Sequence, residues 1–193
     1  MNKMQQIVKF TTDKYLYAGS IVLDMYYGTS FANDIDIFLP YHPDAKNEFK
    51  LINEKKYFVV ELDSNTYADI ISGVFKVYKI INKKSPEYSL DLVYMNVSDP
   101  NISLEDFHKL LVKEFDIVIC SLAWDGNKFY YPPDDLANLK EKTSIMRFKE
   151  CRLPTETKNP RDDVDVYNRR LMIKFARFDK YQNRGFKLTH RLI

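Results

Sequence analysis

Cysteine and histidine are scarce in this chain, and so are the sites that these residues build. The 193 residues include 2 cysteines and 3 histidines. Cys120 and Cys151 have no metal-like spacing, and His42, His108 and His190 are scattered along the chain. We therefore predict no zinc site, a buried position for Cys120 within its apolar run, and a reducing compartment.

Long apolar runs and long polar tracts are also missing. No segment approaches the roughly 18 consecutive apolar residues that a membrane-spanning helix needs, and the N-terminus has no long apolar stretch. No repeat or low-complexity segment occurs, and hydrophobic residues make up 45%, which is enough for a packed core. These features predict a soluble, cytoplasmic protein with no membrane partner.

Charge is unevenly distributed, although the formal net charge is only +2. Residues 140–193 contain 15 basic and 7 acidic side chains, a net charge of +8, while the rest of the chain carries −6. An acidic N-terminal part joined to a basic C-terminal quarter suits a substrate with an anionic backbone.

Residues 15–39 form the most informative segment. An apolar strand leads into Gly19 and Ser20, a short helix follows, and a second strand carries Asp34 and Asp36. Because side chains alternate along a strand, both carboxylates point to one face, and a divalent cation such as Mg²⁺ would relieve their repulsion. A Gly-Ser turn at a helix N-terminus supplies N–H groups and a hydroxyl that suit a phosphate. Together, these features predict a nucleotide site.

This pattern resembles the signature of the DNA polymerase beta-like nucleotidyltransferase superfamily, in which an apolar-Gly-Ser turn and a short helix precede an apolar-flanked Asp-x-Asp. Asn33 stands where that superfamily often has a small polar residue. The superfamily also needs a third carboxylate on a later strand, and Asp91, between Leu90 and Leu92, matches this requirement. The resemblance covers residues 8–95, about half of the chain.

The resemblance implies a metal-dependent transfer of an NMP from an NTP to an acceptor hydroxyl, with release of pyrophosphate. Asp34, Asp36 and Asp91 would be the catalytic residues and would bind two Mg²⁺ (or Mn²⁺) ions about 4 Å apart. Gly19 and Ser20 would bind the terminal phosphates. The acceptor would be an RNA end, such as that of a tRNA, or a protein side chain, and the chain length fits a small stand-alone member.

One feature departs from the superfamily pattern. In many members the helix after Gly-Ser carries an Arg or Lys that meets the triphosphate, but residues 21–27 carry no cation. A stripe of Arg170, Lys174, Arg177 and Tyr181 on the predicted C-terminal helix offers replacements, and Lys76 and Lys79 are further candidates. We predict Lys174 and Arg177 as nucleotide-binding residues, with Lys180 and Arg184 as further contacts to the triphosphate or to a nucleic-acid backbone.

Apolar periodicity, turn residues and the resemblance together predict an α/β (α+β) fold: a nucleotidyltransferase-type mixed β-sheet flanked by helices, with a C-terminal helical segment. We expect strands at residues 14–18, 34–39, 57–62, 73–82, 88–95, 116–124 and 128–131, and helices at residues 20–27, 44–55, 103–113, 135–147 and 161–182. We divide the chain into a catalytic domain, residues 1–131, and a basic helical segment, residues 132–193. An apolar stripe of Leu171, Phe175 and Phe178 would pack that segment onto the catalytic half.

Two other interpretations stay open. A catalytically silent, nucleotide-binding regulatory or antitoxin-like protein of the same fold would also lack the cation at residues 21–27. An interaction protein whose basic helix recruits nucleic acid would bind it regardless of Mg²⁺ and NTP. The presence of all three acids favours the transferase.

Overall fold

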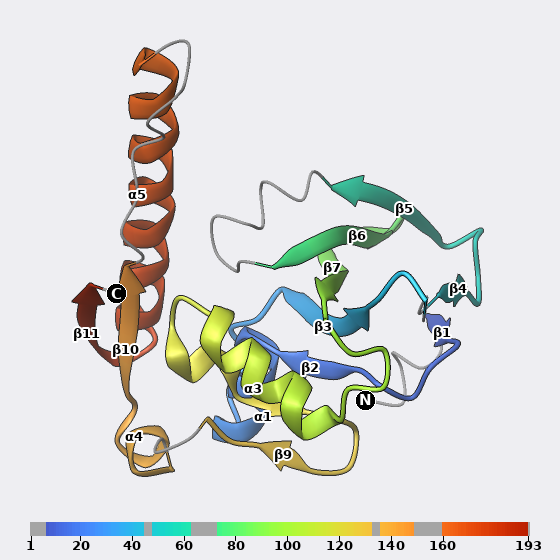
Figure 1. Ribbon diagram of the computed structural model, residues 1–193, viewed down its shortest axis with the longest axis horizontal. Helices are drawn as coiled ribbons and strands as arrows, with labels where there is room; N and C mark the ends of the chain where they lie inside the picture. The colour runs from blue at the N-terminus through green and yellow to red at the C-terminus, as the bar shows by residue number, and fades with distance from the viewer. Residues whose placement is uncertain (1–6, 45–47, 63–72, 133–135, 149–159, 193) are drawn as a thin grey trace.

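A seven-stranded mixed sheet forms the centre of the molecule (Figure 1). The computed structural model describes all residues except 1–6, 45–47, 63–72, 133–135, 149–159 and 193. The strands lie in the order β5-β6-β7-β3-β2-β8-β9. Their bounds are β2 Leu16–Ala18, β3 Asp34–Tyr41, β5 Tyr57–Leu62, β6 Val74–Asn82, β7 Ser85–Asn96, β8 Ala123–Trp124 and β9 Phe129–Tyr130. A mixed sheet flanked by helices, with a C-terminal helix, confirms the predicted α+β fold class.

The two strands that carry the predicted carboxylates are neighbours in this sheet. β3 and β7 run parallel, with Asp34 opposite Ser89 and Asp36 opposite Asp91. The other pairings within the sheet are antiparallel. The apolar residues between these acids alternate to the other face, where most of them are buried.

Two helices within residues 1–131 form where they are predicted. They are α1, Ser20–Tyr27, and α3, Leu104–Glu114. Directly after α3, Phe115 packs against Phe38 of β3, with ring centroids 5.3 Å apart. Phe38 projects from the same face of β3 as the two predicted carboxylates. This contact covers the later part of that face, and the carboxylates occupy the earlier part.

A small two-stranded sheet, β1 Val8–Phe10 and β4 Phe49–Leu51, lies over the opposite face of the central sheet. The helix predicted for residues 44–55 is therefore wrong over β4, and part of that segment lies outside the described residues. The helical pattern is overridden because β4 pairs with β1 and the Phe49 ring packs against Tyr78, with centroids 5.3 Å apart.

The segment between α3 and the C-terminal part is only partly the predicted hairpin. Instead of a long first strand, a short 3-10 helix, η1 Val118–Ser121, precedes β8. The predicted turn between β8 and β9 is confirmed. The carboxylate of Asp125 accepts hydrogen bonds from the N–H groups of Asn127 and Lys128, at 2.7 and 2.9 Å, and so closes the turn.

The C-terminal segment contains two strands in addition to its helices. Its elements are α4 Leu136–Glu141, β10 Thr143–Phe148, α5 Pro160–Asn183 and β11 Lys187–Leu192. The long helix predicted for residues 161–182 is confirmed, but the helix predicted for residues 135–147 ends at Glu141. Lys142 has a φ of 53°, which ends the helix, and β10 then pairs in parallel with β11 beside α5 (Figure 1).

Polar contacts fasten this segment to the rest of the molecule. Arg177 of α5 donates two hydrogen bonds to Asp116, both at 3.0 Å. The Ser144 hydroxyl oxygen of β10 accepts a hydrogen bond from the Ile119 N–H at 2.9 Å. Neither α5 nor any other helix in the described ranges combines the length and the apolar character needed to cross a membrane.

Candidate functional site

The predicted carboxylates belong to a row of polar side chains across the sheet. Asp36 on β3 lies opposite Asp91 on β7, and Asp91 lies opposite Lys79 on β6. Asp34 projects from the same face of β3, two residues before Asp36, and lies opposite Ser89. The structure therefore brings the three acids onto one face and adds Lys79 and Ser89 to them.

Gly19 follows β2, and its conformation brings the backbone against Asp36. Gly19 has a φ of 79° and a ψ of −154°, a region that essentially only glycine adopts. A Cβ atom added at Gly19 would lie 2.7 Å from Asp36 Oδ2, closer than real atoms pack. The Gly19 N–H donates a hydrogen bond to the Cys120 carbonyl at 2.9 Å. The Gly-Ser turn is thus held directly beside a site carboxylate.

We expect Gly19→Ala to lower the free energy of unfolding by about 1–3 kcal/mol, because alanine would be strained in this conformation and would collide with Asp36. Gly28→Ala is the matched control: Gly28 has a φ of 67°, but an added Cβ there meets nothing within 4 Å. Urea denaturation measures both losses. If Gly19→Ala lost no more free energy of unfolding than Gly28→Ala, the Asp36 side chain would move aside at no measurable cost, and the expected collision would be contradicted.

Helix α1 begins at Ser20, immediately after the Gly19 turn. Its first N–H groups have no partner within the helix, and the N-terminal end of a helix attracts anions. The Ser20 hydroxyl lies 3.4 Å from Asp34 Oδ1, to which it donates a long hydrogen bond. A hydroxyl, helix N–H groups and a carboxylate therefore meet at this end of α1, an arrangement suited to a phosphate bound together with a cation.

The ammonium group of Lys79 binds the third carboxylate. Its Nζ lies 2.8 Å from Asp91 Oδ1, 2.9 Å from Asp91 Oδ2 and 2.9 Å from Ser89 Oγ. The side chain of Asp91 is only 3% exposed, and that of Lys79 is 28% exposed. A buried carboxylate is costly without a cationic partner, so Lys79 neutralises Asp91.

A polar pocket of about 370 Å³ opens beside Asp34. Its walls come from the loop before β3, the hairpin of β6 and β7, and the C-terminal end of α5. The lining residues are Phe31, Asn33, Asp34, Lys79, Pro86, Glu87, Ser89, Lys180 and Arg184. Lys180 and Arg184 add positive charge to a pocket whose lining also includes the acidic residues Asp34 and Glu87.

Two contacts shape the loop that leads into β3. Arg184 donates a hydrogen bond to the Phe31 carbonyl at 2.8 Å, and its guanidinium lies between the rings of Phe31 and Tyr181, 5.5 and 5.4 Å from their centroids. Asp24 of α1 accepts a hydrogen bond from the Ala32 N–H at 2.6 Å. Asp24 therefore supports the loop and does not line the pocket.

Lys174 and Arg177, the nucleotide-binding residues predicted on α5, do not line this pocket. Arg177 binds Asp116, and the Lys174 Nζ donates to a backbone carbonyl of β10 at 3.3 Å. Tyr181, which continues the predicted basic stripe, is buried, whereas Phe175 of the predicted apolar stripe is exposed. Arg177 therefore faces the body of the protein, where it compensates the buried Asp116.

The carboxylates fit one hard divalent cation. Mg²⁺ is typically bound through one or two carboxylates, while water and phosphate oxygens fill the other positions, and Asp34 and Asp36 can supply those carboxylates. Both oxygens of Asp91 bind Lys79. Within the described ranges, no group of three or more acidic, histidine or cysteine side chains is arranged to hold a metal ion. The donor set therefore suits Mg²⁺ or Mn²⁺ at Asp34 and Asp36.

Two reactive side chains near the site are structural. Burial raises the pKa of the Cys120 thiol to about 11, so that it stays protonated at neutral pH and offers no thiolate nucleophile. His108 is buried, its Nε2 lies 2.9 Å from the Ser121 carbonyl, and burial lowers its pKa. Neither residue lines the pocket beside Asp34.

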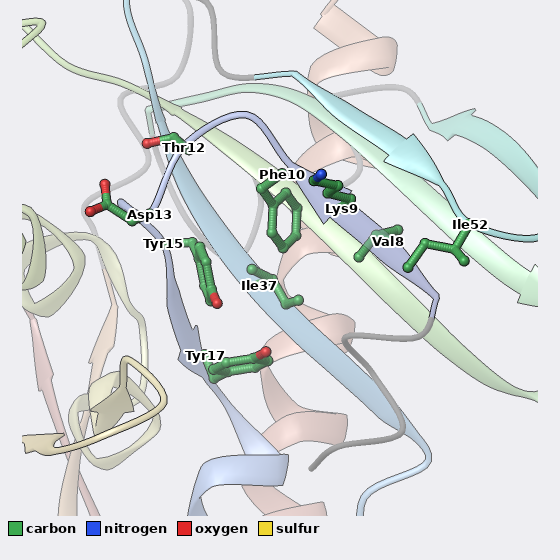
Figure 2. Close-up of a pocket in the computed structure, with 9 residues that line it drawn as sticks. All are labelled: Val8, Lys9, Phe10, Thr12, Asp13, Tyr15, Tyr17, Ile37 and Ile52. Carbon is green, nitrogen blue, oxygen red and sulfur yellow. The ribbon is translucent and has the colours of Figure 1, made fainter.

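Figure 2 shows a different pocket, between the small sheet of β1 and β4 and the central strands β2 and β3. It is largely aromatic and aliphatic, and the Phe10 and Tyr15 rings lie 4.9 Å apart in its wall. Tyr17 and Ile37 also line it and are paired across β2 and β3. Because Ile37 and the site carboxylates alternate on β3, this pocket lies on the opposite face of the sheet.

The sequence pattern does not indicate Ser89, and it gives Lys79 only as one of several candidate triphosphate contacts, not as a partner of Asp91. Their meeting with Asp91 depends on the pairing register of β6 and β7. One signal is visible along β6, where Val77 and Ile81 flank Lys79 on the same face. A lysine within an otherwise apolar strand face indicates a buried counter-ion.

Comparisons with known proteins do not assign this site to a family. The chain matches no protein-family model, and a search of the curated proteins finds no match. The functional interpretation of the site therefore depends on its geometry and chemistry.

Proposed function

We propose that this chain is a metal-dependent nucleotidyltransferase, a small stand-alone member of the DNA polymerase beta-like superfamily. It moves an NMP from an NTP to an acceptor hydroxyl and releases pyrophosphate. The observation that carries the proposal is that Asp34 lies next to the helix end at Ser20, shares a strand face with Asp36, and lines a pocket together with Lys180 and Arg184. Anion-binding N–H groups, metal ligands and positive charge are what a nucleoside triphosphate requires.

The carboxylates and the Gly-Ser turn bind and orient the reactants. Asp34 and Asp36 would hold a Mg²⁺ or Mn²⁺ ion, which would supply neutralisation of phosphate charge and a lower pKa of the acceptor hydroxyl. Gly19 allows the backbone to approach the site, and Ser20 presents its hydroxyl and the helix N–H groups to the terminal phosphates. These residues lower the barrier mainly by positioning and by fixed charge.

The transfer step conserves atoms and charge at the site. The acceptor oxygen forms a bond to the α-phosphorus, and the bond from that phosphorus to the oxygen bridging the α and β positions breaks. The bridging oxygen leaves with the electron pair as part of pyrophosphate. The hydroxyl proton passes to a carboxylate oxygen of Asp34 or Asp36.

Lys180 and Arg184 are the triphosphate contacts in this proposal. They line the pocket next to Asp34, and they supply the positive charge that residues 21–27 lack. They replace the predicted contacts Lys174 and Arg177, which do not line the pocket.

Exposed lysines near the pocket favour RNA over a protein side chain as the acceptor. The Lys83 N–H donates to the Lys56 carbonyl at 3.0 Å, which joins the turn before β5 to the hairpin of β6 and β7. This contact gathers Lys55, Lys56, Lys83 and Lys84, all of which are exposed. The same hairpin forms one wall of the pocket. Clustered lysines attract the phosphate backbone of a nucleic acid.

Incubation of the protein with each α-³²P-labelled NTP, Mg²⁺ or Mn²⁺, and a mixture of cellular RNA and protein tests the proposal. We expect label to enter the RNA fraction and to disappear when the metal is chelated. Label in the protein fraction would keep the transferase and change the acceptor. Absence of label from both fractions with every NTP would contradict the proposal.

A matched pair of variants on α5 tests the triphosphate contacts in the same assay. Lys180→Gln is expected to raise the KM for the NTP about tenfold, because it removes a charge-assisted phosphate contact. Lys174→Gln should leave this KM unchanged, because Lys174 lies outside the pocket and binds a backbone carbonyl. Equal effects of the two variants would remove Lys180 from the phosphate site.

A catalytically silent regulatory or antitoxin-like protein of the same fold is the second candidate. The ion pair of Lys79 with Asp91 favours it, because a carboxylate held at 2.8 Å by an ammonium group is not a free metal ligand. Metal-dependent NTP binding in a calorimeter, without label in any fraction, would support this candidate over the transferase.

A further inference from the structure

The ion pair of Lys79 and Asp91 lies inside the row of site carboxylates, where a two-metal site would place a second ion. We infer that the ammonium group of Lys79 permanently takes the place of that second ion, so that the site works with one divalent cation and one lysine. This inference rests on the proposed function. It makes Asp91 the residue that positions Lys79 instead of a metal ligand.

The residues around Lys79 form a binding site for its ammonium group. A lysine ammonium has three N–H donors and no acceptor. In the structure its three partners are Ser89 Oγ and both carboxylate oxygens of Asp91, all within 2.9 Å. Ser89 and Asp91 are two residues apart on β7 and so project from the same face. Every donor of Lys79 therefore has an acceptor on one neighbouring strand.

Burial makes this arrangement hard to exchange for a metal ion. The Asp91 side chain is 3% exposed. A second cation would have to displace an ammonium group from both oxygens of a buried carboxylate, and Mg²⁺ gives up its own waters reluctantly. Removing one partner of such a buried pair is strongly unfavourable. The bound lysine is thus the stable state of this position.

The charges of the site balance with one metal ion. Asp34, Asp36 and Asp91 project from one face of adjacent strands and carry three negative charges when ionised. Lys79 contributes one positive charge, and a divalent cation at Asp34 and Asp36 contributes the remaining two. A second divalent ion would leave the carboxylate row with excess positive charge before any nucleotide binds.

Titration of the full-length protein with Mn²⁺ alone, followed by electron paramagnetic resonance, counts the bound ions. The wild type is expected to bind about one Mn²⁺ per chain, and Asp36→Asn should lose it. Lys79→Ala removes the ammonium group from Asp91, so its count is expected to rise to about two. Lys76→Ala is the matched control on the same strand, because Lys76 pairs with the exposed Glu61 at 3.4 Å, and its count should stay at about one.

Asp91→Asn provides a second test that does not depend on the folding of Lys79→Ala. In a one-metal site Asp91→Asn leaves the count at about one, whereas in a two-metal site it lowers the count from about two. Two specific ions in the wild type, or one ion in a folded Lys79→Ala, would overturn the inference and leave the transferase intact. No specific ion in the wild type would contradict the metal site of the proposed function itself.

Discussion

Asp36→Asn is expected to reduce nucleotidyl transfer by about a thousandfold or more. Asp36 lies at the centre of the site: it is opposite Asp91 in the sheet, on the same face as Asp34, with Oδ2 against the backbone of Gly19. Asparagine keeps the shape of the side chain but removes the negative charge that binds a hard cation. The variant therefore loses neutralisation of phosphate charge and activation of the acceptor hydroxyl together.

Incorporation of α-³²P label measures this loss. Asp13→Asn is the matched control, because Asp13 lines the pocket on the opposite face of the sheet (Figure 2) and should leave incorporation at the wild-type level. Urea denaturation should show that Asp36→Asn is as stable as the wild type, which separates lost chemistry from unfolding. Activity of Asp36→Asn within about tenfold of the wild type would contradict the assignment of Asp36 as a metal ligand.

Arg177→Ala is expected to lower the free energy of unfolding by about 3–5 kcal/mol. The guanidinium of Arg177 binds both oxygens of Asp116 at 3.0 Å, and the two side chains are 21% and 4% exposed. The substitution would leave the Asp116 carboxylate buried without its cation. Its hydrogen bond from the Ile117 N–H, at 2.8 Å, does not replace the lost charge.

Urea denaturation measures the loss of stability, and two further variants serve as controls. Lys128→Ala breaks an ion pair with Glu105 in which both side chains are more than half exposed, so we expect no measurable change. Arg177→Lys keeps the charge but loses the bidentate geometry, so its free energy of unfolding should lie between those of the wild type and Arg177→Ala. If Arg177→Ala were as stable as Lys128→Ala, Arg177 would again be a candidate nucleotide ligand.

Most of the sheet could be predicted from local sequence patterns. The strand at residues 57–62 and the helix at residues 20–27 form where apolar periodicity and turn residues place them. Two of the errors, at β4 and β10, share a cause. Each of these segments is a strand only because a distant strand, β1 or β11, lies beside it. Such pairing leaves little trace in the segment itself.

In the candidate site, too, some features follow from local sequence and others depend on the pairing of distant strands. The sequence predicts that Asp34 and Asp36 share a strand face and that a Gly-Ser turn begins the preceding helix. Both features depend only on residues close together in the chain. The resemblance implied that Asp91 joins the other two acids, but the parallel pairing of β3 with β7 that places it beside Asp36 was not predicted.

The sequence by itself therefore determined the fold class and the acidic face of β3, because strand alternation and turn geometry act over a few residues. Only the tertiary structure decided which cation meets which acid. It pairs Lys79 with Asp91 and Arg177 with Asp116, and it brings Lys180 to the pocket. A basic residue on a helix or strand has the same local pattern whether it is solvated or buried. Its partner is set by the carboxylate that packing places opposite it, since a buried charge must be compensated.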